Sequence, residues 1–464
     1  MRFIRPLLLL LGAYCCIGLA PLFLIDLRSY SPFTLAFCRF FGASLIEFLL
    51  IILVFFILKG ELTTYFRLNP HRAPKEQGAE TPRKTIGFWQ LVKLSLGQYY
   101  LASNKRFLKG RTQLAFLIWL GFNLVAISVP SLYLSYNLSG VAVSIIGING
   151  LSIFCVAIYN WVRKEEEMDL LKGIYLSLII AAVVTIAYSS STGFMPLTFP
   201  GIVSILISIV SFVIFLIGLG NDPTAHILLL DEWNLSRRRK VVAEQLLVLL
   251  KALFKLFAIH FFGAILIIPI TALLAFIVPG SLEGNIAATF LFVELPQLGT
   301  ILQNPAILGL IIGCTAIPYF LIMYSSVIWP RHALKQSLWA SIFSLVELLL
   351  GLYLGWLVWH ETIRVDYIAF TTLFIAAVIL IRYFYENANV QRVLFLMKLK
   401  RGQLDLVLQN LLKIKEMDTL DFVTGNYDIV MQVTVRSMHR VSEIAEKCKR
   451  ISDVKELTYC IVGK

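Results

Sequence analysis

Long apolar runs dominate the first 385 residues of the chain. A helix that crosses a bilayer needs about 20 mostly apolar residues, and runs of that length recur along the sequence. They lie near 5–25, 33–58, 112–134, 138–162, 169–189, 199–219, 257–278, 304–328, 333–359 and 365–385. The sequence lacks the alternating ten-residue segments of a membrane barrel. The pattern therefore predicts a polytopic α-helical membrane protein with about ten transmembrane helices.

Composition supports a membrane protein and excludes several other classes. The chain is 58% hydrophobic and only 15% charged, whereas soluble proteins carry about 25% charged residues. A single soluble domain and a disordered chain are both excluded. The seven cysteines form no CxxC pair or Cys/His cluster, and no nucleotide-binding or catalytic motif is present. We therefore expect no enzyme, no metal site and no cofactor.

The net charge of +13 is distributed unevenly between the predicted connections. Lys and Arg concentrate in the connections 59–111 and 220–256 and after residue 385, and the opposite connections contain only Arg28 and Arg364. The positive-inside rule then places both termini in the cytoplasm of a multi-pass plasma-membrane protein. Residues 86–110 are amphipathic and predict a helix on the inner leaflet, in contact with lipid.

Two segments around the span 257–278 extend beyond a simple membrane crossing. Residues 236–278 predict one long helix whose basic first half stays in the cytosol, and residues 279–303 predict a long outside loop. Pro130, Pro269 and Pro318 fall inside predicted spans, which we expect them to kink.

An internal repeat relates residues 138–189 to 333–384. IIAAVV begins at 179 and FIAAVI at 374, and the same offset pairs Asn149 with Ser344 and Ser152 with Glu347. Two five-helix units of opposite orientation are typical of secondary transporters, which bind substrate between the repeats. The predicted units are 1–189, with an insert at 59–111, and 198–385, with inserts at 220–245 and 279–303.

The helical part resembles the EamA-type drug/metabolite transporter superfamily. The similar segments are SPFTLAFCRFFGASLIEFLL, SGVAVSIIGINGLSIFCVAIYNWVRKEEEMDLLKG and LKQSLWASIFSLVELLLGLYLGWLVWHETIRVDY. The resemblance covers most of residues 1–385 and implies a 5+5 inverted repeat that transports small metabolites.

Ionisable residues deep inside spans are the candidates for transport. Arg39, Glu47 and Glu347 each lie within a predicted span, where a charge is costly unless it is paired or hydrated. The predicted cavity adds the polar repeat positions Asn149, Ser152 and Ser344. A carboxyl group at this depth could also carry a proton, so proton coupling through Glu47 or Glu347 is a hypothesis.

Simpler roles remain open for these side chains. Arg39 could extend to the outer interface, and the small polar residues could merely allow close helix packing. His260 and His360 look isolated and are not assigned as ligands.

After residue 390 the pattern changes to short alternating strands and amphipathic helices in the order β-α-β-β-α-β. This order predicts a C-terminal α/β ferredoxin-like domain in the cytosol, over residues 390–464. LDFVTG and YDIVMQVTV predict a hairpin around a tight Gly425-Asn426 turn.

The segment VTGNYDIVMQVTV, with ISDVKELTYCIV after it, closely resembles the effector-binding domain of Lrp/AsnC regulators. The resemblance implies binding of small molecules, often amino acids, beside Gly425, Asn426, Tyr427 and Asp428, and a homodimer formed through the sheet. The alternative is that these residues only build the turn. The DNA-reading helix-turn-helix of those regulators is absent from this sequence, so we expect no nucleic-acid binding.

Taken together, the patterns predict a secondary transporter that exports amino acids or similar small metabolites under control of a cytosolic ligand-binding domain. A membrane sensor or scaffold without transport is the alternative. A membrane enzyme or lipid-handling protein that uses the segment 86–110 is a third alternative.

Overall fold

The computed structural model describes residues 4–68, 110–162, 199–220, 237–328, 336–358, 365–388 and 391–400, and most of 407–462, with single-residue breaks; a few positions between 173 and 181 are also described. The predicted span 169–189 and the predicted interfacial helix 86–110 lie almost entirely outside these residues.

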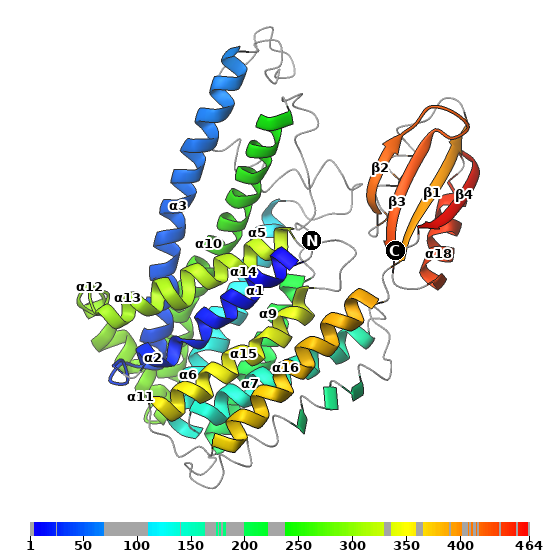
Figure 1. Ribbon diagram of the computed structural model, residues 1–464. Helices are drawn as coiled ribbons and strands as arrows, with labels where there is room; N and C mark the ends of the chain where they lie inside the picture. Colours follow the sequence, from blue (N-terminus) through cyan, green and yellow to red (C-terminus); the bar gives the residue numbers. More distant parts are fainter. Residues whose placement is uncertain are drawn as a thin grey trace.

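The described residues up to Ala388 form a bundle of helices (Figure 1). The helices before the long α10 are α1 (Ile4–Gly18), α2 (Ala20–Leu24), α3 (Pro32–Leu68), α5 (Gly110–Gly121), the π-helix η3 (Phe122–Ser128), α6 (Val129–Ser139), α7 (Val141–Val162) and α9 (Phe199–Gly220). Those that follow are α10 (Arg237–Ile277), α11 (Leu282–Thr289), the π-helix η5 (Phe290–Glu294), η6 (Leu295–Gln297), α12 (Leu298–Ile301), α13 (Pro305–Ile311), the π-helix η7 (Ile312–Ala316), α14 (Ile317–Ile328), α15 (Gln336–Leu357) and α16 (Val365–Ala388).

Six stretches within the described residues are long and apolar enough to cross a membrane. They are Ile4–Leu24, Pro32–Leu58, Leu114–Tyr136, Phe199–Leu219, Leu249–Ile277 and Pro305–Ser326. The helices α7, α15 and α16 coincide with three further predicted spans. Each contains an apolar stretch that is shorter than the length of a typical membrane crossing: Gly147–Tyr159, Ile342–Gly351 and Ile368–Phe384. The structure thus supports a membrane-spanning helical region without confirming ten spans.

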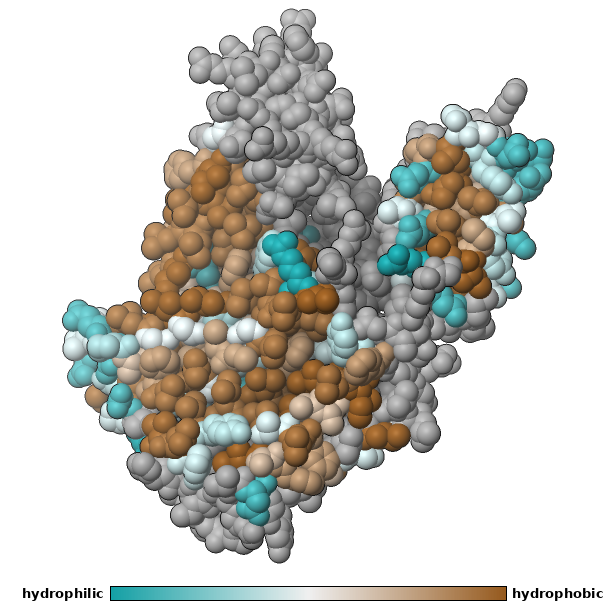
Figure 2. Space-filling model, viewed as in Figure 1, coloured by the Kyte–Doolittle hydropathy of each residue, from teal (hydrophilic) through white to brown (hydrophobic). Residues whose placement is uncertain are grey.

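Apolar side chains dominate the coloured surface of the helical region in Figure 2. On α3 they form a stripe at helical spacing, in which Leu45, Phe48, Leu49, Leu53 and Phe56 are between 44% and 65% exposed. Such a large exposed apolar surface is unfavourable in water and matches the acyl chains of a bilayer. The opposite side of the helix packs against the bundle, so α3 has one face toward lipid and one toward protein.

The two longest helices, α3 and α10, pack against each other along their length. They contain 37 and 41 residues, which correspond to about 55 and 60 Å, well beyond the roughly 30 Å apolar core of a bilayer. Figure 1 shows both helices extending past the rest of the bundle at the same end. The prediction of one long helix over 236–278 is confirmed.

The prediction of an outside loop over 279–303 is wrong. Ser281 caps α11, accepting a hydrogen bond from the Gly284 N–H at 3.0 Å, and helical segments continue to Ile301. Phe290 of η5 is fully buried while Phe292 is 76% exposed. This segment therefore folds into short helices, of which α11 and η5 pack on α10.

All three π-helical segments end two residues before a proline. η3 ends at Ser128 before Pro130, η5 at Glu294 before Pro296, and η7 at Ala316 before Pro318. Because proline has no N–H, the carbonyl four residues earlier loses its helical donor, and π-bulges are a common accompaniment of such breaks. In contrast, Pro269 lies within the continuous helix α10.

The bounds of α7 and α15 support the proposed duplication. Both ends of α15 (336 and 357) lie 195 residues after the corresponding ends of α7 (141 and 162). This is the offset found in the sequence, and the two helices pack directly against each other. The assignment of two complete five-helix units stays a prediction.

Gly121 and Gly263 mark the closest approach of α5 to α10. A Cβ on Gly121 would come within 2.3 Å of the Ile259 carbonyl oxygen, and one on Gly263 within 2.7 Å of the Gly121 carbonyl oxygen. Both obstructing atoms belong to the backbone, which cannot rotate away. Glycine is therefore required for the two helices to touch at this point.

We expect Gly121→Ala to destabilise the helical region by about 1–3 kcal/mol through overpacking. The matched control is Gly12→Ala on α1, where a Cβ would meet nothing within 4 Å and where alanine should be neutral or slightly stabilising. Thermal unfolding of the purified protein in detergent measures the difference. Equal melting temperatures for the two variants would contradict the close α5–α10 contact.

The C-terminal residues form a separate α/β unit. Its strands are β1 (Gln391–Leu399), β2 (Met417–Phe422), β3 (Ile429–Val435) and β4 (Val454–Val462), and α18 (Met438–Lys449) lies between β3 and β4. The strands pair antiparallel in the order β2-β3-β1-β4. This order agrees with the predicted ferredoxin-like fold.

The core of this unit is formed by one face of the sheet. Alternate residues of β1 (Val393, Phe395 and Met397) are fully buried, as are their cross-strand partners on β3 (Val433, Met431 and Ile429). Val407 and Leu411, from the predicted first helix, and Ile444 and Cys448 from α18 complete the same cluster. Burial raises the pKa of Cys448 to about 12, so its thiol stays neutral and packs as an apolar side chain.

Candidate functional site

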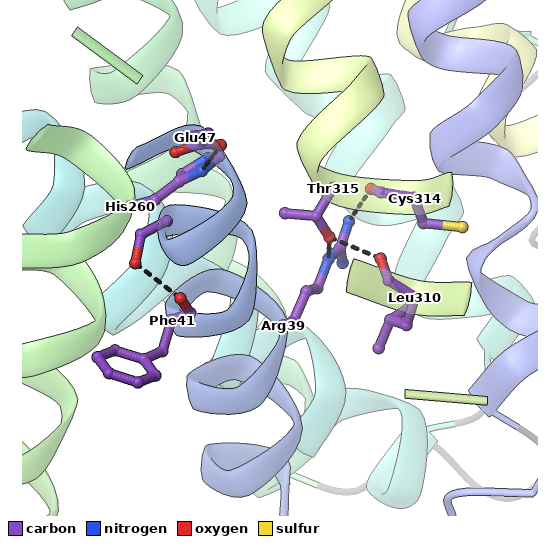
Figure 3. Close-up of polar contacts among 8 residues, drawn as sticks. Arg39, Phe41, Glu47, His260, Leu310, Cys314 and Thr315 are labelled. Atoms are coloured by element: carbon purple, nitrogen blue, oxygen red, sulfur yellow. Dashed lines mark hydrogen bonds and ion pairs between the residues drawn. The ribbon is translucent and has the colours of Figure 1, made fainter. Parts of the chain in front are cut away.

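Arg39 is a buried arginine on α3 that points into the protein. Its side chain is only 4% exposed. Nε donates to Thr315 Oγ1 at 2.6 Å, Nη1 to the Tyr133 hydroxyl at 2.7 Å and Nη2 to the Cys314 carbonyl oxygen at 2.7 Å. Figure 3 shows the contacts with residues 314 and 315. All three acceptors are uncharged, so the guanidinium is oriented by the protein without a carboxylate in hydrogen-bond contact.

The break in the helix at η7 supplies two of these acceptors. Pro318 cannot donate to the carbonyl of Cys314, four residues earlier, and that carbonyl accepts from Arg39 instead. The hydroxyl of Thr315 accepts from Arg39 while it donates to the Leu310 carbonyl at 2.9 Å. π-helical segments are frequent at functional sites because they expose backbone groups in this way.

Glu347 of α15 lies across from Arg39 in a cluster rich in tyrosine. The carboxyl group is half-buried and interacts electrostatically with Arg39. It also interacts electrostatically with the side chains of Tyr14, Tyr133, Tyr136 and Tyr319. Gly18 allows α1 to reach this position, since a Cβ there would lie 3.1 Å from the Glu347 Cα. Five helical segments, α1, α3, α6, η7–α14 and α15, thus converge on one polar centre.

The other predicted repeat residues lie on the helix pair α7–α15. Asn149, Ser152 and Ser344 are at most 3% exposed. The Ser152 hydroxyl donates to the Asn149 carbonyl within α7 at 3.0 Å. A Cβ on Gly351 would come 3.1 Å from Ile145 Cδ1, so the two helices pack tightly. The three residues therefore lie on two closely packed helices. That they line a transport cavity stays a prediction.

Glu47 belongs to a second site on another side of α3. Its Oε1 lies 2.7 Å from His260 Nδ1 of α10, and both side chains are at most 1% exposed (Figure 3). The expectation that His260 is isolated is therefore wrong. A buried carboxyl group requires a partner, and the packing of α3 on α10 determines that His260 is this partner.

A third polar cluster, which the sequence reasoning missed, closes the N-terminus of α3. Glu294 Oε1 accepts from the Ser31 N–H at 2.9 Å and Oε2 from the Ser31 hydroxyl at 2.5 Å. The Thr34 hydroxyl also donates to Oε2. A carboxylate at a helix N-terminus is stabilised by the free N–H groups and the helix dipole. Glu294 was overlooked because 279–303 was taken for a loop.

The predicted effector residues form an exposed connection between β2 and β3. Phe422 pairs with Ile429, so the connection has six residues and is not the tight two-residue turn that we expected. Gly425 adopts a φ of 133°, which favours glycine. The connection is longer because Asp428 forms two hydrogen bonds with β1. Its N–H donates to the Met397 carbonyl oxygen, and its Oδ2 accepts from the Leu399 N–H at 2.7 Å.

We expect Asp428→Ala to destabilise the C-terminal unit by about 1 kcal/mol, because it removes the acceptor for the Leu399 N–H. Asp421→Ala, at an exposed site on β2, is the control and should change stability by less than about 0.5 kcal/mol. Urea-dependent proteolysis of the full chain, followed by mapping of cuts in 391–462, gives both values. Equal midpoints would show that the Asp428 carboxylate does not hold β1.

The comparisons with known proteins bear on the two parts of the chain differently. The curated proteins contain no significant match to the chain. The helical part has no match to the EamA-type family, so that resemblance stays a prediction. Residues 392–464 match the family model described as the Lrp/AsnC ligand binding domain, which confirms the family resemblance of the C-terminal unit.

Proposed function

We propose that this protein is a secondary transporter that exports amino acids or similar small metabolites, regulated by its C-terminal ligand-binding domain. The observation that carries the proposal is the buried Arg39 guanidinium and its electrostatic interaction with Glu347 in the tyrosine-lined cluster where five helical segments meet. Charged groups are costly inside a membrane protein and mark substrate or ion pathways.

The chemistry of this cluster suits a zwitterion. A guanidinium has five N–H donors in a planar fork, and three of them are used by Thr315, Tyr133 and Cys314. The remaining N–H groups can bind a substrate carboxylate. The Glu347 carboxylate, when ionised, can accept from an α-ammonium group, and the tyrosine hydroxyls can serve either end.

The duplicated helices support transport rather than simple binding. α7 and α15 share their repeat offset and pack together, as expected for two units related by a pseudo-twofold axis. Similar halves of opposite orientation can open to either side of a membrane at nearly equal energy.

The C-terminal domain supplies the regulation in this proposal. The match to a ligand-binding family supports small-molecule binding and oligomerisation. Apolar side chains of the unit are exposed, among them Phe422 (55%), Tyr459 (41%) and Ile461 (50%), and exposed apolar groups favour association. We propose a homodimer through this sheet, with both termini in the cytoplasm of a plasma-membrane protein.

Exchange of labelled compounds across proteoliposomes that contain the full chain tests this function. We expect exchange of at least one of the twenty amino acids, and none of the matching amine without its carboxylate or of the matching acid without its ammonium group. Calorimetry with the same amino acids tests the regulatory domain. Heat without any exchange would contradict transport and favour the alternative, a membrane sensor that signals through the C-terminal domain.

A further inference from the structure

The Glu47–His260 pair has spare proton-binding capacity inside the helical region. Glu47 Oε1 and His260 Nδ1 are 2.7 Å apart, so a hydrogen bond joins the carboxyl group and the imidazole. Glu47 Oε2 and His260 Nε2 are both buried and have no hydrogen-bond partner. Buried polar atoms without partners are rare in proteins and call for an explanation, such as a catalytic or ion-carrying role.

Two aromatic rings connect this pair to the Arg39 cluster. The Phe40 ring lies 5.0 Å from the His260 ring and 5.3 Å from the Arg39 guanidinium carbon. The Tyr319 ring contacts His260 edge-on at 5.2 Å, and its hydroxyl interacts electrostatically with Arg39 and Glu347. A change of charge at His260 is thus felt through closely packed, polarizable groups at the substrate site.

Other ionisable groups on the neighbouring elements are engaged elsewhere or lie far along the helices. Arg39 of α3 donates hydrogen bonds to Tyr133 of α6 and to Cys314 of η7. Glu294 of η5 accepts a hydrogen bond from Ser31 at the N-terminus of α3. Glu294 is therefore close to Ser31, which precedes Glu47 by 16 residues, or about 24 Å of helix.

The remaining elements packed on α10 contribute little charge near His260. α5 contains only Arg111, near its start; η3 contains no ionisable residue; and α11 contains only Glu283, in its first turn. On α10 itself, Lys251 and Lys255 precede His260 and make contacts of their own. Among the described residues, Tyr319 is thus the ionisable side chain from outside the pair whose ring touches His260.

We propose that Glu47 and His260 together form a proton-binding site that couples a pH gradient to the substrate site at Arg39. In the pair of ionised Glu47 and neutral His260, Nδ1–H donates to Oε1. One further proton binds at the free Nε2 of His260 and changes the net charge of the pair from −1 to 0. The same proton leaves when the site opens to the other side. The coupling rests on the proposed transport function, whereas the proton site itself does not.

Nuclear magnetic resonance of the full chain in liposomes, labelled with ¹⁵N-histidine, tests the proton site directly. The chain has six histidines, and the signal lost in His260→Gln identifies His260. We expect the nitrogen signals of His260 to change across a series of buffers from about pH 5 to pH 8, and this change to differ in Glu47→Gln. Signals that stay constant over this range, or that titrate identically in Glu47→Gln, overturn the proposal.

Transport in proteoliposomes tests the coupling with ¹⁴C-labelled amino acids as the probe. The measured quantity is the ratio of accumulation driven by a pH gradient to exchange at equal pH. We expect Glu47→Gln and His260→Gln each to lower this ratio at least about tenfold. Glu446→Gln, at a site 70% exposed on α18, is the matched control and should keep the wild-type ratio. An unchanged ratio in both pair variants overturns the coupling. Absence of exchange in the wild-type protein refutes the proposed function instead, and the histidine titration still decides the proton site.

Discussion

Replacing Arg39 with glutamine is expected to weaken amino-acid binding and exchange by roughly 30- to 1,000-fold. Loss of a buried charged group that pairs with a substrate carboxylate costs about 2–4 kcal/mol, and every 1.4 kcal/mol or so is a factor of ten. Glutamine still offers an amide to the Tyr133 hydroxyl and the Cys314 carbonyl, so folding should be less affected than binding.

Two further variants make the Arg39 result specific. Arg39→Lys keeps the charge but loses the planar fork, and we expect an intermediate loss of about tenfold. Arg5→Gln, at an exposed site at the start of α1, should behave as wild type. Exchange at the wild-type rate by monodisperse Arg39→Gln protein would show that the substrate binds elsewhere.

The second large effect concerns the core of the C-terminal domain. Phe395 on β1 is fully buried against the helices, and Phe395→Ala should cost about 3–5 kcal/mol. A domain of this size is stable by roughly 4–10 kcal/mol, so the unfolded fraction rises about 100- to 5,000-fold. Pulse proteolysis of the full chain should reveal rapid cleavage within 391–462, and the heat of ligand binding should fall accordingly.

Phe422→Ala provides the matched control, because this phenylalanine lies in the same sheet but is 55% exposed. We expect its cleavage rate to stay close to that of the wild type. If the two alanine variants are cleaved equally fast, the buried face of the sheet has been assigned incorrectly.

The C-terminal domain was the part best predicted from the sequence, because a strand buried on one face alternates residue by residue. RVLFLMKL and YDIVMQVTV each contain this alternation, and the structure places Val393, Phe395 and Met397 opposite Val433, Met431 and Ile429. Local pattern did not reveal the length of the β2–β3 connection. That length depends on Asp428 bonding to β1, a contact across 29 residues of sequence.

The helical region was predicted less completely, because spans are apolar on all sides and contain little information on which faces meet. Arg39 and Glu47 could be selected from depth alone, but their partners could not. Thr315, Cys314 and Tyr133 became recognisable only when α3, α6 and η7 were placed together. The His260 pairing follows in the same way from the packing of α3 on α10, and Glu294 from the folding of 282–301 into short helices.

The carbonyl left free by Pro318 has a consequence for which sequence changes this protein can tolerate. Every amino acid has a main-chain oxygen, so position 314 can vary in side chain without loss of the hydrogen bond to Arg39. Position 318 has no such freedom, because any other residue would restore an N–H that competes for that oxygen. A proline that itself makes no hydrogen bond to Arg39 would then be among the least replaceable residues of the fold, and a Pro318→Ala substitution would alter how strongly the arginine fork is held.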